Sequence, residues 1–188
     1  NWQNPVGNTF NANSSNVHLS GVTQTVTSGG STFYKLTSEG TGDKTLLDNT
    51  SVSNQLTLTG TKINAVSGSL IIVSGASVVR STPASTSTEY IIGNLIKSYN
   101  SGQLNQVFET GVASKYTPAN ISFSSVTASG TFMVSAIAGL HPSNSGSQID
   151  PLKCANVYWN VTNSGVAFTN STVKLTHNAI ITGGTPAN

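Results

Sequence analysis

Residues 55–79 read QLTLTGTKINAVSGSLIIVSGASVV and contain three short apolar runs separated by Gly and Ser. The runs are Gln55–Thr59, Leu70–Val73 and Ser77–Val79. In the first of them leucines alternate with threonines, as expected of a strand with one buried face. Because strands this short bury little apolar surface each, we expect them to stack as the rungs of a β-solenoid with one continuous core.

The same pattern extends through residues 1–80. Further runs that we expect to be strands follow one another about every 8 to 12 residues, with turns rich in Gly, Asn and Ser between them. They are Asn16–Leu19, Gln24–Thr27, Thr32–Thr37 and Lys44–Leu47. We therefore predict a solenoid segment over residues 1–80, with an ordinary antiparallel sandwich as the alternative.

The sequence changes character after Arg80. Residues 81–88, Ser-Thr-Pro-Ala-Ser-Thr-Ser-Thr, predict a linker or a long loop. Residues 89–188 have longer and more aromatic runs, and we predict an antiparallel β-sandwich-like module there. Its expected strands are Glu89–Lys97, Gln106–Phe108, Ile121–Phe123, Gly130–Ala138, Asn156–Thr162, Val166–Phe168 and Thr172–His177. The predicted fold class is all-β, an N-terminal solenoid followed by a sandwich.

The composition is neutral and polar. Only 7% of the residues are charged, against about 25% in a typical globular domain. The formal net charge of +2 comes without a basic run, so we expect no nucleic-acid binding. No apolar stretch approaches the roughly 20 residues of a membrane helix, and we expect no membrane insertion. Ser, Thr and Asn number 28, 25 and 20, which is typical of secreted and cell-surface proteins.

The chain begins at Asn1 and contains no signal-like apolar segment. We expect it to be a mature or excised fragment of an extracellular protein. Cys154 is the only cysteine, which excludes an intramolecular disulfide and predicts a small buried side chain.

Several stretches resemble a known group of proteins. Trp2, Gly7–Ala12, Val17–Gly21, Thr23–Val26 and Thr32–Leu36 resemble repeats of large secreted surface proteins of the Bacteroidetes type, and Val52–Gly60 with Ser69–Val73 resembles the rungs that follow those repeats. Tyr90–Leu95, Tyr116–Ala119, Gly130–Val134 and Val157–Thr162 are similar to the module beside such rungs. The resemblance implies an adhesin or filament protein with a β-solenoid passing into a β-sandwich, and it implies no catalytic residues. Tyr34-Lys35-Leu36 departs from the repeats, which usually have Asn before the Leu.

Residues suited to catalysis are sparse. We expect His18 in a strand, His141 in a turn and His177 at a strand end. No Gly-x-Ser-x-Gly elbow accompanies them, so we predict no hydrolytic triad and no enzyme activity. Glu39 and Asp43, with Asp48 nearby, are the only clustered carboxylates. We interpret them as a polar turn rather than a calcium loop, and we predict no metal and no cofactor.

A covalent cross-link is a separate hypothesis, because some surface β-sandwiches join a Lys to an Asn beside a buried carboxylate. The residue types are present in Lys97, Lys153 and Lys174 and in Glu89, Glu109 and Asp150.

Two adjacent aromatic residues are candidate ligand-binding residues. Tyr158 and Trp159 occupy one expected strand, so they point to opposite faces. One should be in the core, and the other, with Asn160 and Asn163 nearby, could stack on a sugar ring. Packing against a neighbouring strand or subunit is the alternative.

These observations predict a non-catalytic extracellular structural protein, a building block or segment of a bacterial cell-surface filament or adhesin. Its expected partners are other copies or neighbouring repeats of the same surface protein, joined by β-strand addition. The β-prone residues Ala179, Ile180 and Ile181 are the candidate polymer contact. The alternative is a carbohydrate-binding module of a larger secreted protein, with glycans as its partners.

Overall fold

The computed structural model describes residues 1–85, 87–144 and 154–177, and this part of the chain is all-β. It contains sixteen strands, and its one helical element is a short 3-10 turn, η1 (Pro142–Asn144). The strands of the first half are β1 (Trp2–Gln3), β2 (Asn16–Leu19), β3 (Gln24–Thr27), β4 (Thr32–Ser38), β5 (Lys44–Leu46), β6 (Thr50–Leu58), β7 (Ile63–Ile72) and β8 (Ser77–Arg80). Those of the second half are β9 (Ile91–Tyr99), β10 (Asn105–Phe108), β11 (Gly111–Val112), β12 (Lys115–Tyr116), β13 (Ala119–Ala128), β14 (Gly130–Ala138), β15 (Val157–Ser164) and β16 (Ala167–Leu175).

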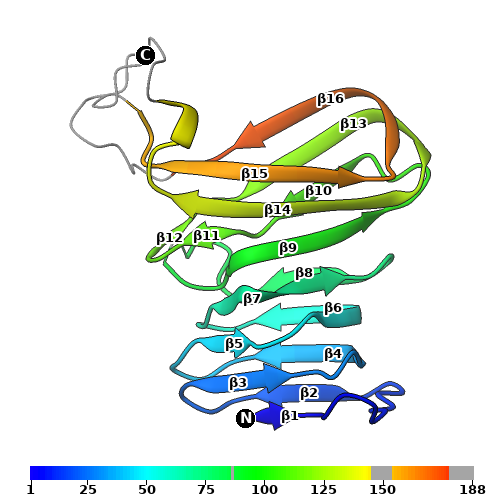
Figure 1. Cartoon of the computed structure of the whole chain (residues 1–188), viewed down its shortest axis with the longest axis vertical. Helices are drawn as coiled ribbons and strands as arrows, with labels where there is room; N and C mark the ends of the chain where they lie inside the picture. The colour runs from blue at the N-terminus through cyan, green and yellow to red at the C-terminus, as the bar shows by residue number, and fades with distance from the viewer. Residues whose placement is uncertain (86, 145–153, 178–188) are drawn as a thin grey trace.

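The first half is a β-solenoid-like stack of parallel strands (Figure 1). One ladder runs through β1, β3, β5, β7 and β9, and a second runs through β2, β4, β6 and β8. Gln24 pairs with Lys44 and Lys35 pairs with Gln55, each 20 residues apart. The rung spacing varies along the stack, from 19 residues between Asn16 and Lys35 to 28 between Ile63 and Ile91. The predicted solenoid is therefore confirmed at the level of its strand arrangement.

The core consists of apolar side chains stacked in columns from rung to rung. Phe33, Val52 and Ile72 form one column through the pairing of β4, β6 and β7, and each is at most 2% exposed. Because every rung buries its apolar side chains against the next one, the hydrophobic effect acts along the whole axis.

The core continues past the Ser/Thr/Pro segment. Residues 81–88 form a loop between β8 and β9, of which residue 86 is not described. β9 nevertheless pairs with β7 over Ile63–Ile72, and one buried cluster extends from Leu19 to Val166. The change of sequence after Arg80 thus marks no break in the core, and the parallel stacking continues through β9.

Beyond β9 the strands run antiparallel. β9 pairs with β14, and β14 pairs with β15, while β10, β13 and β16 form a second sheet. The rings of Tyr99, Phe123 and Phe132 pack between these two sheets, with centroids 5.2 to 5.5 Å apart.

Most expected strands are present, and the differences have local causes. The expected strand Gly130–Ala138 coincides with β14. The two expected strands after residue 165 are one strand, β16, because their polar middle pairs with β13. β1, β11 and β12 are not expected from the sequence, because two residues carry too little alternation to be recognised. The strand expected at Leu70–Val73 begins earlier, at Ile63, in β7.

Candidate functional site

The C-terminal end of the stack has two strands with an unpaired edge. In the part of the chain that the structure describes, β15 pairs only with β14, and β16 pairs only with β13. The two strands contain eight and nine residues and lie at the opposite end of the molecule from β1 and β2 (Figure 1). Long rows of unpaired N–H and C=O groups are templates for pairing with another strand.

Apolar side chains that face the interior are exposed at this end. Val161 is opposite the fully buried Val134 and yet is 42% exposed. Val173 is opposite the buried Ile121 and is 48% exposed. Leu175 likewise faces inward and is exposed. We call β15 and β16 with these side chains the open end.

The N-terminal end is closed by aromatic side chains instead. Trp2 and Phe10 pack on Phe33 of the second rung, with ring centroids 5.3 and 5.7 Å from that of Phe33. The edge strands β1 and β2 contain only two and four residues. The two ends therefore differ, and the long apolar edges belong to the C-terminal one.

A cleft of about 420 Å³ opens where β9 and β14 separate. Their antiparallel pairing extends from Gly130 with Tyr99 to Val134 with Leu95 and ends there. Beyond this point Ile92, Gly93 and Asn94 line one side, and Ser135–Ala138 line the other. β11 and the following turn line the gap between the two strands.

Three polar side chains converge on this cleft. Ser135 of β14 is directly opposite Asn160 of β15, and Asn94 follows on β9 where the pairing ends. Ser135 is only 6% exposed. Within the described residues, none of the three side chains makes a hydrogen bond to the protein, so their donors and acceptors are available to a ligand.

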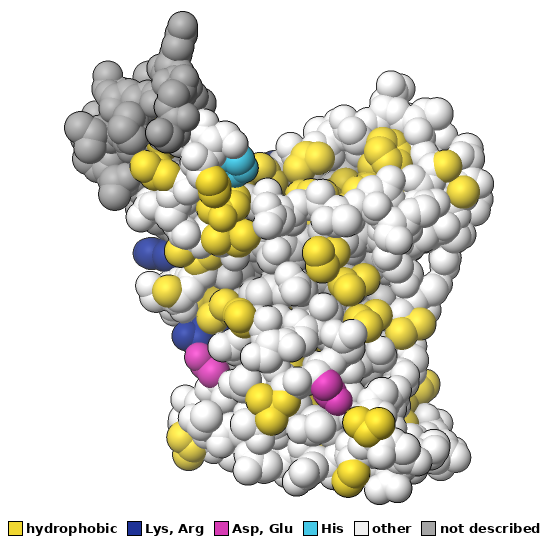
Figure 2. All heavy atoms as spheres, in the orientation of Figure 1, with side chains coloured by type: hydrophobic (Ala, Val, Ile, Leu, Met, Phe, Trp, Pro, Cys, Tyr) yellow, Lys and Arg dark blue, Asp and Glu magenta, His cyan; other side chains and the backbone are white. Residues whose placement is uncertain are grey.

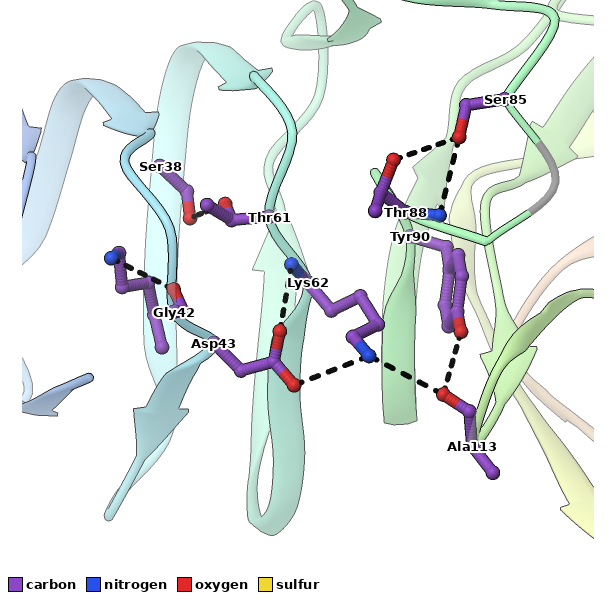
Figure 3. A network of polar contacts seen from close by, with 10 residues as sticks. Ser38, Gly42, Asp43, Thr61, Lys62, Ser85, Thr88, Tyr90 and Ala113 are labelled. Carbon is purple, nitrogen blue, oxygen red and sulfur yellow. Dashed lines mark hydrogen bonds and ion pairs between the residues drawn. The ribbon is translucent and has the colours of Figure 1, made fainter. Parts of the chain in front are cut away.

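The wall of the cleft at Ala113 is held by two side chains, Tyr90 and Lys62, that meet at its carbonyl oxygen (Figure 3). The hydroxyl of Tyr90 donates to the carbonyl oxygen of Ala113 at 2.8 Å, and Lys62 Nζ lies 3.4 Å from the same oxygen. Lys62 also pairs with Asp43 of the preceding rung at 3.4 Å. Burial raises the pKa of Tyr90 to about 12, so its hydroxyl keeps the proton that it donates.

The two aromatic candidates point to opposite faces. Trp159 faces inward, where its indole Nε1 donates to the carbonyl oxygen of Thr117 at 2.9 Å. Tyr158 faces outward with its ring against His141, the centroids 5.0 Å apart, and lies opposite Ile137 of the cleft. The structure thus places Tyr158, not Trp159, on the outer face of β15, beside the cleft rather than in its lining. Ala179, Ile180 and Ile181 lie outside the described residues.

The clustered carboxylates are used separately, as links between rungs. Asp48 accepts the backbone N–H groups of Ser28 and Gly29 at 2.8 and 2.7 Å. Glu39 pairs with His18 Nδ1 at 2.9 Å, and Asp43 pairs with Lys62. Among the described residues, no three His, Cys, Asp or Glu side chains come together as metal ligands would.

A buried ion pair replaces apolar packing where the solenoid ends. Lys97 follows Ile72 in the column of Phe33 and Val52, and its Nζ lies 2.7 Å from Glu109 Oε2. Nζ also donates to the carbonyl oxygen of Val107 at 2.7 Å. Of the groups in the cross-link hypothesis, the structure therefore joins Lys97 and Glu109 as a buried ion pair. Lys174 lies on the exposed strand β16, and Lys153 and Asp150 lie outside the described residues.

Glu89 closes the loop after β8. Its carboxylate accepts hydrogen bonds from the N–H of Gly60 at 2.8 Å, the hydroxyl of Ser81 at 2.7 Å and the N–H of Thr82 at 2.7 Å. Burial acts to raise the pKa of Glu89, but these hydrogen bonds outweigh it and leave that pKa below its ordinary value. Arg80 donates to the Glu89 carbonyl oxygen at 2.7 Å.

Comparison of the chain with protein families, with curated proteins and with solved structures found no match. No helix in residues 1–85, 87–144 and 154–177 has the length and apolar character that crossing a membrane requires.

Proposed function

We propose that the protein is a non-catalytic structural element of an extracellular surface, a building block or segment of a bacterial cell-surface filament or adhesin. In this proposal it assembles end to end by β-strand addition, and the open end is the acceptor. The antiparallel half then acts as a β-sandwich-like terminal module that presents two strand edges to the next unit. The open end carries the proposal, because it combines unpaired backbone with inward-facing apolar side chains.

The solenoid explains why such an end favours a further strand. Each inner rung is covered on both sides, whereas, among the described residues, β15 and β16 are each paired on one side only. An added strand would pair its backbone with β15 or β16 and cover Val161 and Val173, whose exposed area is otherwise hydrated. The occupant that we propose is the segment around Ala179–Thr182 of a neighbouring copy, since it is apolar and β-prone.

A structural role also fits the way in which the few reactive groups are used. His18, Glu39, Asp43 and Asp48 contact neighbouring rungs, and Lys97 is neutralised by Glu109 within the core. In the described part of the chain, the acidic and basic side chains thus act mainly as links within the fold.

Sedimentation velocity and negative-stain electron microscopy over a range of concentrations test the proposal. We expect the full chain to form end-to-end species, and Val173→Lys to remain monomeric because it places a charge in the open end. Leu47→Lys is the matched control, since Leu47 is 50% exposed, close to the 48% of Val173, and directly follows β5 in the solenoid half. A full chain that stays monomeric at high concentration, or equal association of both variants, would overturn the proposal.

Removal of residues 178–188 separates two ways of covering the open end. If these residues are donated to a neighbour, their removal abolishes association. If they instead cover the edge of their own chain, removal exposes that edge and increases association, and donation between copies is then wrong.

A further inference from the structure

We propose that the cleft between β9 and β14 binds an uncharged saccharide unit. The side chains of Asn94, Ser135 and Asn160 form a polar row across three strands, and none of them has a hydrogen-bond partner within the described part of the protein. Ser135 is the most informative of the three, because it is 94% buried and its hydroxyl faces the cleft. Its hydroxyl oxygen is open to the cleft rather than sealed in the core, so a ligand hydroxyl can replace the water that reaches it.

The spacing of the polar row suits a sugar ring. Side chains directly opposite each other on antiparallel strands stand about 5 Å apart, so Ser135 and Asn160 can contact two hydroxyl groups of a single ring. Amide and hydroxyl side chains both donate and accept, which matches the dual character of sugar hydroxyls. Asn94, on the far side of the gap, contacts the ring from the opposite direction.

The apolar walls provide the other half of saccharide recognition. Ile92, Ile137 and Val112 line the cleft, and such surfaces pack against the C–H groups of a sugar. Tyr158 lies opposite Ile137 on the same face as Asn160, so its half-buried ring can stack on a neighbouring sugar unit. The described residues of the lining include no charged side chain, which favours a neutral saccharide over a uronic acid or a sulfated sugar.

The cleft is built before a ligand arrives. The carbonyl oxygen of Ala113 is fixed by the Tyr90 hydroxyl at 2.8 Å, and the floor lies over the buried side chains of Val112 and Ala136. A site on fixed strands loses little conformational entropy when it binds. Its volume of about 420 Å³ is within the range of ordinary small-molecule sites.

Binding of the full chain to neutral and anionic oligosaccharides, by glycan array and then by calorimetry, tests this proposal. We expect retention of neutral glycans. Ser135→Ala should weaken binding about 2- to 10-fold, the value of one hydrogen bond. Ser135→Leu, which fills the cleft, should abolish binding. Ser124→Ala is the matched control, an exposed serine on β13 in the other sheet, and it should bind as the unchanged chain does.

Thermal melts of each variant establish that it is folded before its binding is judged. Retention of anionic glycans only, capture of apolar peptides in place of sugars, or unchanged binding by a folded Ser135→Leu variant would overturn the proposal. Val173→Lys should bind saccharide normally, so a failure at the cleft and a failure of end-to-end assembly are distinguishable.

Discussion

Replacing Lys97 by Met should destabilise the protein strongly, whereas replacing its partner as well should restore stability. Lys97 Nζ and Glu109 Oε2 are 2.7 Å apart, and their side chains are only 7% and 11% exposed. In Lys97→Met the Glu109 carboxylate stays buried without its counter-ion, which typically costs about 3–5 kcal/mol. The Val107 carbonyl oxygen also loses the ammonium that donates to it.

The double variant Lys97→Met, Glu109→Leu removes both charges and keeps similar side-chain volumes. Buried ion pairs replaced in this way are often neutral or stabilising by about 1–4 kcal/mol. The position favours this outcome, because Ile72, Val52 and Phe33 are apolar in the same column. We therefore expect the double variant to be at least as stable as the unchanged chain.

Urea unfolding followed by circular dichroism and by tryptophan fluorescence measures these differences. Coincident transitions from the two probes would justify a single free energy of unfolding for each variant. If Lys97→Met is as stable as the unchanged chain, the ion pair does not stabilise the junction. If the double variant is less stable than both single variants, the reasoning from desolvation is wrong.

Four further outcomes are expected. Hydrogen bonds lower the pKa of Glu89 in the folded state, so ionised Glu89 stabilises the protein at pH values above its pKa in the unfolded chain. This stabilisation is lost as the pH falls through the pKa of Glu89 in the folded protein. Glu89→Gln should therefore flatten the acid side of the profile of melting temperature against pH. Gly93→Ala should cost about 1–3 kcal/mol in urea unfolding, since Gly93 has a φ of +98° and an added Cβ would lie 2.6 Å from the Ala65 backbone. Gly75→Ala, with a φ of +82° and open space around it, should cost about 1 kcal/mol, and equal costs would show that the Ala65 contact is irrelevant. The intact mass should equal the sequence mass, because Lys97 Nζ is held by Glu109 and Val107, and loss of one ammonia would reveal a Lys–Asn bond. End-to-end association should persist in 1 M NaCl, where charge pairs are screened, and dissociation there would indicate that charged side chains hold the contact.

The strands could be predicted from the sequence where alternation and turn residues agree. Gly130–Ala138 alternates Phe132, Val134 and Ala136 with more polar residues and begins at a glycine, and it is β14 without change. Strands of the first half could be predicted for the same reason, because every rung has to bury its inward-facing apolar side chains. The spacing of the rungs could not be recognised, because it varies from 19 to 28 residues and the stacked positions share only their apolar character, not a fixed residue.

The cleft could not be predicted, because it depends on which strands pair and in which register. Ser and Asn are so frequent in this chain that Asn94, Ser135 and Asn160 give no signal of their own. A shift of one residue in β15 would turn Asn160 inward and Trp159 outward. Alternation therefore predicted that Tyr158 and Trp159 face opposite ways, but not which of them faces the core. Lys97 could have been recognised, since it alternates with Leu95 and Tyr99 on the buried face of β9.

The scarcity of charge follows from the stacking itself. Rungs in a parallel ladder lie about 4.8 Å apart. A charged side chain repeated on successive rungs would therefore be repelled by the like charges directly above and below it. Neutral Ser, Thr and Asn avoid this repulsion and still keep the surface hydrated, and the face in Figure 2 shows few charged side chains among neutral ones. Several of the charges that remain join neighbouring rungs, as in the pairs of Glu39 with His18 and of Asp43 with Lys62. In the proposed assembly such a surface recognises its neighbours through backbone pairing and apolar cover at the open end, and in the proposed saccharide site it uses neutral hydrogen bonds in the cleft.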